Sequence, residues 1–258
     1  MRFHHLPKLT TLILAIFFGA AFFSSAPYSM ISPAQAQATY PHLVSIKKPS
    51  ISYASKGNFY LLAISITDPA IYTPGLAYLW GWIKGDWVVI PKSVIFPANK
   101  TPQEIYKSNK AEMVSSQKSA ISAALNFLAK KYPKDYKNLK AEDITFDIKR
   151  TGGPSGGLVL ALSIIELATE KDLLRGRQIA TTGTINPAGF VGAIGGVNEK
   201  LISVARQGIP TVLIPSDNCL DISSVPDGVT VIPVSTLEEA VEVITGEKVA
   251  RVCTNLRA

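Results

Sequence analysis

The stretch TGGPSGG (151–157), followed by LVLALSIIELATEK (158–171), decides the fold. The apolar run predicts a helix that ends near Lys171. The glycines on both sides of Pro154-Ser155 permit unusual backbone dihedrals and leave space for a substrate backbone. Ser155 therefore stands where the chain enters a helix. Free amides at such a position, together with the helix dipole, can stabilise a developing oxyanion.

Taken alone, this loop leaves three interpretations open. Ser155 can be a nucleophile, or the loop can be a phosphate-binding turn at the start of a helix. Ser155 can also be a simple helix cap, because serine is a favoured N-cap residue. Residues elsewhere in the chain have to decide among these interpretations.

Several classes of catalytic site are excluded by what the sequence lacks. Its three histidines, His4, His5 and His42, lie in the N-terminal segment or just beyond it, so a Ser-His-Asp triad is not expected. No G-x-x-x-x-G-K-[ST] loop is present, so we expect no ATPase within this chain. Neither H-E-x-x-H nor C-x-x-C is present to indicate zinc. We therefore expect no metal and no cofactor.

Without histidine, a nucleophilic serine needs another base, and lysine is the usual one. Lys200 lies in the first turn of a predicted helix over 197–207, with Ile194, Val197 and Leu201 close in sequence. Burial among apolar groups and a helix N-terminus both lower a lysine pKa. To act as a base near pH 7, that pKa must fall by about 3 from its ordinary value of about 10.4. The alternative is a solvated surface lysine.

The remaining pattern mixes helices with short strands, which indicates the α/β or α+β class. Additional helices are predicted over 101–132 and 235–244, and strands over 59–67, 87–90, 144–148, 178–185, 211–214 and 229–233. Residues 37–58 read as extended, and 68–100, which hold all three tryptophans, as irregular around the strand at 87–90. We expect the tryptophans in the core or on a partner-facing surface rather than in a ligand site.

The first 36 residues resemble a targeting segment. Arg2 and Lys8 precede an apolar run over 12–23, and Ala34-Gln35-Ala36 forms a small-x-small cleavage site. The run is short for a membrane span, which needs about 20 apolar residues. Residues 1–36 are thus either a cleaved signal peptide or a retained membrane anchor, and both alternatives place the rest of the chain outside the cytoplasm.

Composition and charge limit the kinds of binding partner that we expect. The 258 residues are 47% hydrophobic and 17% charged, so the chain can bury a core. Its net charge of +7 comes from scattered Lys and Arg residues, which favours a solvated cationic surface and gives no reason to expect nucleic-acid binding. Cys219 and Cys253 can pair in an oxidising compartment or remain two thiols, and the sequence leaves both alternatives open.

Three motifs occur in the order that is typical of one family. The runs TGGPSGG (151–157), TTGTI (181–185) and GFVGAIGGVNEKLISVARQGIPTVLIP (189–215) resemble the proteolytic domain of Lon peptidases. The resemblance covers about residues 144–246. It implies an α+β fold with mixed short sheets and helices, preceded by a small N-terminal region.

The resemblance also implies roles for individual residues. The nucleophile of the family lies in a G-P-S-[AG]-G motif that matches Ser155, and its base in an I-G-G-x-x-[EQ]-K motif that matches Lys200. Thr182 matches a threonine that hydrogen-bonds the lysine. The expected activity is ATP-independent cleavage of polypeptide substrates by acyl transfer. Lon-type domains often form rings, so a homo-oligomer is implied as well.

The loop residues Gly153, Pro154 and Gly156 are expected to hold the substrate and the oxyanion. Gly157 completes a P-S-G-G sequence where P-S-A-G is usual in the family, and Gly152 stands where ATP-dependent members often carry an acidic residue. Because the nucleophile, base and threonine are all present, these departures leave the catalytic pair intact. The alternative is a catalytically silent Lon-fold module used for binding or assembly.

The resemblance is closer to extracytoplasmic relatives that combine a PDZ domain with a Lon-type domain, on the runs EMVSSQ (112–117), SDNC (216–219) and PDG (226–228). About twenty residues separate the long helix from Gly152, too few for a PDZ domain. The expected organisation is a targeting segment (1–36), a strand and long-helix region (37–143), a Lon-type proteolytic domain (144–246) and a tail (247–258).

Overall fold

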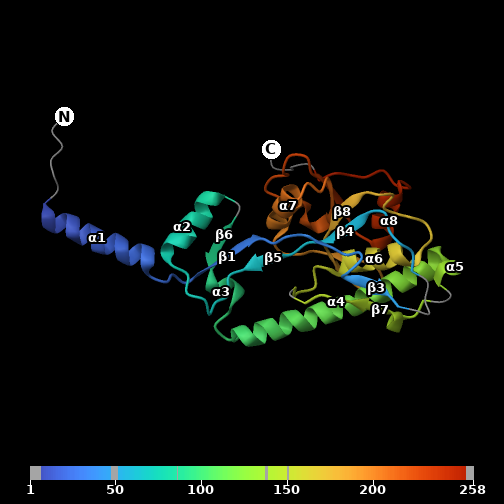
Figure 1. The fold of residues 1–258 in the computed structure, drawn as a ribbon, viewed down its shortest axis with the longest axis horizontal. Helices are drawn as coiled ribbons and strands as arrows, with labels where there is room; N and C mark the ends of the chain where they lie inside the picture. Colours follow the sequence, from blue (N-terminus) through green and yellow to red (C-terminus); the bar gives the residue numbers. More distant parts are fainter. Residues whose placement is uncertain (1–6, 48–51, 86, 137–138, 150, 254–258) are drawn as a thin grey trace. The chain divides into compact units, whose positions relative to one another are not determined.

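The computed structural model describes residues 7–47, 52–85, 87–136, 139–149 and 151–253, which form two compact units (Figure 1). The first unit contains the described residues up to Ser32 together with Ser65–Pro102. The second contains Pro33–Ile64 and the described residues from Gln103 onward. All of the predicted site residues belong to the second unit.

The first unit is built from a three-stranded sheet and helices. The strands follow the order β5-β1-β6, and β1 runs antiparallel to β6 with Tyr28 opposite Pro91. The helix α1 packs against α2. The bounds are α1 (Lys8–Phe23), β1 (Tyr28–Pro33), β5 (Ile64–Ile66), α2 (Gly75–Lys84), β6 (Val88–Pro91) and α3 (Lys92–Ile95). Residues of the predicted targeting segment therefore take part in a sheet.

The prediction of irregular structure over 68–100 is wrong, because α2 and α3 lie within this range. At the end of α2, Gly85 has a φ of 73°, the left-handed conformation that commonly closes a helix. Inside α2, a Cβ at Gly81 would lie 2.8 Å from the Trp87 ring, so close packing requires a glycine there. Glycine and aromatic residues are weaker helix formers than alanine or leucine, which hid this helix in the sequence pattern.

Exposed apolar side chains characterise both longer helices of this unit. Trp80 and Trp82 of α2 expose 57% and 72% of their surface, so they lie on the surface and not in the core. The helix α1 buries none of its side chains. Of the helices within the described residues, none has the combination of length and apolar content that a bilayer crossing requires. The interpretation of residues 1–36 as a signal peptide or anchor stays a prediction.

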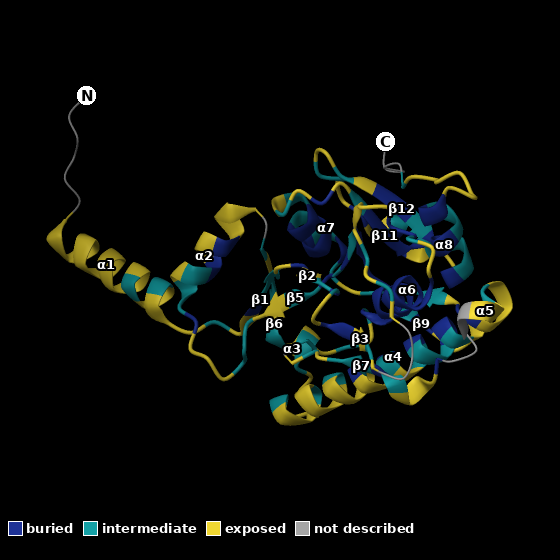
Figure 2. Ribbon diagram, turned by 45° about the vertical axis from the view of Figure 1, so that its right-hand side comes forward, coloured by how far each residue is buried: buried dark blue, intermediate teal, exposed yellow. Residues whose placement is uncertain are grey.

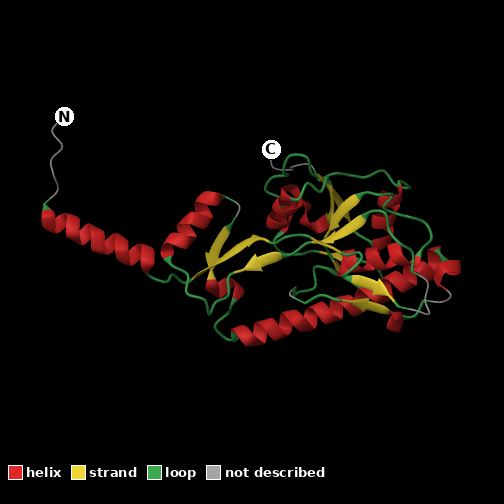
Figure 3. Ribbon diagram, viewed as in Figure 1, coloured by secondary structure: helices red, strands yellow, loops and turns green. Residues whose placement is uncertain are grey.

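The second unit is organised around a five-stranded sheet (Figure 3). Its order is β12-β11-β8-β4-β2, with the first four strands parallel and β2 antiparallel at the edge. The bounds are β2 (Gln37–Ala38), β4 (Asn58–Leu61), β8 (Gln178–Thr181), β11 (Thr211–Pro215) and β12 (Thr230–Val234). Two antiparallel pairs join β3 (Val44–Ile46) to β7 (Ile144–Phe146) and β9 (Thr184–Ile185) to β10 (Val191–Gly192). The predicted α+β fold with mixed short sheets is confirmed.

Helices enclose this sheet. Their bounds are α4 (Pro102–Lys131), α5 (Pro133–Tyr136), α6 (Gly157–Ala168), α7 (Val197–Arg206) and α8 (Leu237–Thr245), with 3-10 turns η1 (Ala141–Asp143) and η2 (Ser216–Asp221). Every residue of α6 is buried, and the helix is dark blue along its whole length in Figure 2. Its hydrophobic core includes Leu128 of α4 and Val241 of α8, whereas a second core packs Leu201 of α7 against Val212 of β11. The predicted long helix over 101–132 is confirmed by α4.

Two predicted strands are each divided in the structure. The prediction over 59–67 combines β4 and β5, and that over 178–185 combines β8 and β9. The second division occurs around Gly183, where a Cβ would lie only 2.9 Å from Val191 Cγ1 and 3.3 Å from Leu158 Cβ. The chain leaves the main sheet here, because the Gly183 N–H bonds to the carbonyl of Ser155 instead of to a neighbouring strand.

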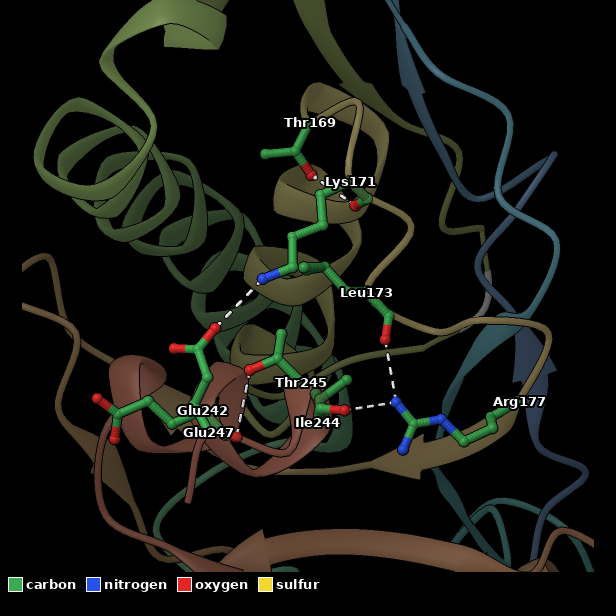
Figure 4. Close-up of polar contacts among 8 residues, drawn as sticks. All are labelled: Thr169, Lys171, Leu173, Arg177, Glu242, Ile244, Thr245 and Glu247. Atoms are coloured by element: carbon green, nitrogen blue, oxygen red, sulfur yellow. Dashed lines mark hydrogen bonds and ion pairs between the residues drawn. The ribbon is translucent and has the colours of Figure 1, made fainter.

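The helix α6 is shorter than predicted. It ends at Ala168, because Thr169 is extended and its hydroxyl donates to the carbonyl of Ile165 at 2.9 Å. Beyond this end, polar contacts join the 171–177 segment to the end of α8 (Figure 4). The Arg177 guanidinium donates to the carbonyls of Leu173 and Ile244, and Lys171 pairs with Glu247 at 3.2 Å. These contacts fix the chain where it enters β8.

Cys219 of η2 and Cys253 form a disulfide with a Cα–Cα distance of 5.5 Å. The N–H of Cys253 also donates to the carbonyl of Val231 in β12 at 3.0 Å. Of the two alternatives that the sequence left open, the structure shows the paired one. Within the second unit, the bond ties the segment after α8 to η2.

The two glycines at the start of α6 differ in what surrounds them. A Cβ at Gly157 would lie 2.8 Å from Ile185 Cγ2, 2.9 Å from Ser116 Oγ and 3.0 Å from the Ile185 backbone nitrogen. A Cβ at Gly156 would meet only the ends of flexible side chains, Leu61 Cδ1 at 2.9 Å and Met113 Cε at 3.9 Å. Gly157 is thus required by close packing on β9.

Gly157→Ala is expected to lower the free energy of unfolding by about 1–3 kcal/mol, because the added methyl group must displace the backbone of β9. Gly156→Ala is expected to change it by less than about 1 kcal/mol, because a leucine side chain can move aside. Urea denaturation of both variants compares these costs directly. Equal losses in the two variants would show that packing on β9 is not what requires Gly157.

Candidate active site

Ser155 lies in the turn that leads into α6, and its side chain is half-buried. Its carbonyl oxygen accepts two hydrogen bonds, from the Gly183 N–H at 2.8 Å and from the Thr182 hydroxyl at 3.2 Å. Both donors lie in the short segment between β8 and β9. The loop that carries Ser155 is therefore fixed to the edge of the main sheet.

Thr182 connects this loop to Lys200. Its side chain is fully buried, and its N–H donates to the carbonyl of Leu213 in β11 at 3.1 Å. The Lys200 ammonium donates to Thr182 Oγ1 at 3.0 Å. A chain of hydrogen bonds thus runs from Lys200 Nζ through the Thr182 hydroxyl to the carbonyl of Ser155. The structure brings the three predicted residues together, and their catalytic roles stay predictions.

The environment of Lys200 lowers its proton affinity. Only 2% of the residue is exposed, in the first turn of α7. Burial, which disfavours the charged form, lowers the pKa of Lys200 from 10.5 to about 8, and the negative charge of Glu199 opposes this change. A minor but significant fraction of the amine is therefore neutral near pH 7.

The backbone N–H groups in the Ser155 loop differ in whether they are free to donate a hydrogen bond to a bound group. The Gly153 N–H donates to the carbonyl of Asn109 at 2.9 Å, and Pro154 has no N–H. Gly153, with a φ of 82°, therefore shapes the loop and does not supply a free donor. For the N–H groups of Ser155 and Gly156, no acceptor is found among the described residues. These two amides are therefore free to donate to a bound group, which an oxyanion site would need.

A cleft beside this loop was not predicted from the sequence. It has a volume of about 140 Å³ and is lined by Glu112, Ser115, Ser116, Ser119, Pro154, Thr184 and Ile185. The first four residues come from α4, about forty positions before Ser155. Their spacing places them on one helix face. The sequence contains this spacing, but the spacing does not show which other element the face contacts.

Comparisons with known proteins show the family that this chain resembles in sequence. Residues 73–247 match the family model for the Lon protease (S16) C-terminal proteolytic domain. The Lon protease of Neorickettsia sennetsu is 31% identical over 187 residues, which cover 68% of this chain and 21% of that protein. The Lon protease of Clostridium beijerinckii is 32% identical over 143 residues, 52% of this chain and 18% of that protein. The chain thus spans at most about a fifth of the length of these relatives.

Lys200→Met is expected to raise the free energy of unfolding at pH 7 by about 3 kcal/mol, because it removes a charge that burial disfavours. Folded wild-type protein releases this proton near pH 8, whereas the unfolded chain keeps it to about pH 10.5. The cost in the wild type is therefore complete below pH 8 and disappears as the pH rises toward 10.5.

Urea denaturation of wild type and Lys200→Met between pH 6 and 10 measures this effect. The stability difference should shrink above pH 8. Lys118→Met, which changes an exposed lysine, is the matched control and should show little difference at any pH. A Lys200→Met variant that is less stable than the wild type at pH 7 would contradict the burial argument.

Proposed function

Because the chain belongs to the Lon (S16) protease family, we propose that it is an ATP-independent serine endopeptidase with Ser155 as nucleophile and Lys200 as general base. The observation that carries this proposal is the hydrogen-bond chain from Lys200 through Thr182 to the Ser155 loop. A solvated surface lysine, or a serine that only caps a helix, would not need this arrangement.

The proposed reaction is acyl transfer in two steps. Neutral Lys200 takes the proton of the Ser155 hydroxyl as Oγ attacks the peptide carbonyl, and the lysine then gives that proton to the leaving amine. The amides of Ser155 and Gly156 hold the oxyanion of the tetrahedral intermediate. Water, deprotonated by Lys200, then hydrolyses the acyl-enzyme and frees Ser155.

Thr182 is proposed to orient the amine. Its hydroxyl proton points to the carbonyl of Ser155, so its oxygen accepts from Lys200 Nζ. Holding one N–H in this way leaves the nitrogen lone pair free to face the Ser155 side chain. Thr182 acts through Lys200 and is a positioning residue.

Ser155→Ala and Lys200→Met are each expected to abolish peptide cleavage, and Ser155→Ala also labelling by a fluorophosphonate probe. Loss of a general base costs about 10²–10⁴-fold, and a catalytic pair acts as a unit. Thr182→Val, which keeps the shape without the hydroxyl, should lower turnover by about 10–100-fold. Peptide turnover and probe labelling are measured on the same preparations.

The outcomes separate this proposal from the alternative of a silent binding module. Labelling that requires Ser155, together with turnover that requires Lys200, supports a peptidase. Wild-type protein that is folded but neither labelled nor active on any peptide would favour the silent module. Turnover in Lys200→Met above about a tenth of wild type would contradict the assigned base.

We also propose that the second unit works outside the cytoplasm. The disulfide between Cys219 and Cys253 supports this location, because such bonds persist in oxidising compartments. The apolar surface of α1, which begins at Lys8, supports a role of the N-terminal segment as a signal or an anchor. The homo-oligomeric ring that the family resemblance implies stays a prediction, and light scattering would measure it.

Thiol alkylation of intact cells before lysis tests the location. Both cysteines are expected to resist alkylation until a reductant is added. After reduction, mass spectrometry should detect alkyl groups on two cysteines. N-terminal sequencing of the same material shows whether residues 1–36 are retained. Two cysteines that react without reduction would contradict an oxidising compartment.

A further inference from the structure

The cleft beside the Ser155 loop has an apolar floor and a polar mouth. Ile185 is buried at its inner side, whereas Glu112 and Ser115 are exposed. Its volume of about 140 Å³ is below the range of sites that hold a whole small ligand, about 300–1,000 Å³, and suits a single side chain. A long side chain can therefore enter it without rearranging the fold.

The cleft is joined directly to the nucleophile loop. Pro154, one of its lining residues, precedes Ser155 by one position, about 3.8 Å between Cα atoms. Ser116 Oγ donates to the carbonyl of Pro154 at 3.0 Å and so holds the α4 wall against this loop. A peptide whose scissile carbonyl lies at Ser155 therefore has a neighbouring side chain within reach of the cleft.

Glu112 is the one charged residue among those that line the cleft. Ser108 donates to its carboxylate at 3.4 Å, and no Lys or Arg within the described residues forms an ion pair with it. The other walls on α4 are serine hydroxyls. This lining suits a side chain with an aliphatic stem and a cationic end, because the stem contacts the floor while the charge stays at the wet mouth.

We propose that this cleft binds a Lys or Arg side chain of the substrate next to the scissile bond and that Glu112 is the residue that selects it. The inference rests on the proposed peptidase function and adds the class of substrate. Within the substrate, Glu112 is proposed to contact only the selected side chain, and it takes no part in proton transfer at Ser155.

The experiment compares matched peptides that carry Lys or norleucine at each position flanking the scissile bond, cleaved by the full chain. Norleucine keeps the aliphatic stem and lacks the charge. At one of these positions, wild-type kcat/KM for Lys is expected to exceed that for norleucine about fivefold, the scale of an exposed ion pair. This ratio should fall to about one in Glu112→Gln and below one in Glu112→Lys.

Glu170→Gln is the matched control. Glu170 is also exposed, but it lies beyond the end of α6, whereas Ser155 precedes the start of this twelve-residue helix. The Lys-to-norleucine ratio of this variant should equal that of the wild type. A ratio that falls equally in both variants would show a general charge effect and would overturn the role of Glu112.

Two failures are distinguishable. If fluorophosphonate labels Ser155 and peptides are cleaved, but Lys and norleucine substrates react equally at all positions, the cleft does not select a cation and the inference is wrong. If Ser155-dependent labelling and cleavage are both absent, the proposed function has failed and the inference falls with it.

Discussion

The hydrogen bond between Lys200 and Thr182 depends on keeping an amine away from water. A lysine is normally exposed and charged, and this one is buried with its pKa lowered to about 8. Burial by itself destabilises the folded state, so the rest of the second unit must compensate for it. The entirely buried helix α6 and the parallel strands β4, β8 and β11 provide that rigid surrounding.

The same packing explains how separate segments meet at one point. The chain leaves the main sheet after β8, and this exit lets Thr182 and Gly183 bond to the loop of Ser155. The helix α7 carries Lys200 in its first turn. Gly196, which has a φ of 68°, is the N-cap residue directly before this helix. Three loops with unusual backbone geometry are thus held by regular elements, the arrangement by which rigid scaffolds commonly position functional residues.

Much of the site could be predicted because its signals are local. Glycines around Ser155 and before Lys200 mark special backbone positions, and the absence of a usable histidine directs attention to lysine. Hydrophobic periodicity and Pro133 predicted the long helix α4, whereas the pattern left α/β and α+β open and the family resemblance favoured α+β. Periodicity could not reveal the break at Gly183, because that break is caused by hydrogen bonds to a loop almost thirty residues earlier.

Other features depend on tertiary proximity and had no local signal. The cleft is lined by residues of α4 and β9, and nothing in the sequence of either element predicts that the two lie close together. The pairing of Cys219 with Cys253 required geometry, since sequence alone allowed two free thiols as well. The helix α2 was missed for another reason: helix propensity disfavours a glycine at position 81, whereas the Trp87 ring beside it requires one.

The central claim is that a buried, neutral Lys200 activates Ser155, and the pH dependence of Ser155 acylation tests it most directly. The second-order rate of fluorophosphonate labelling should rise about tenfold per pH unit below a midpoint near pH 8 and then level off. A rate that is independent of pH between 6 and 10, or that rises only near the ordinary lysine pKa of about 10.4, would contradict the account.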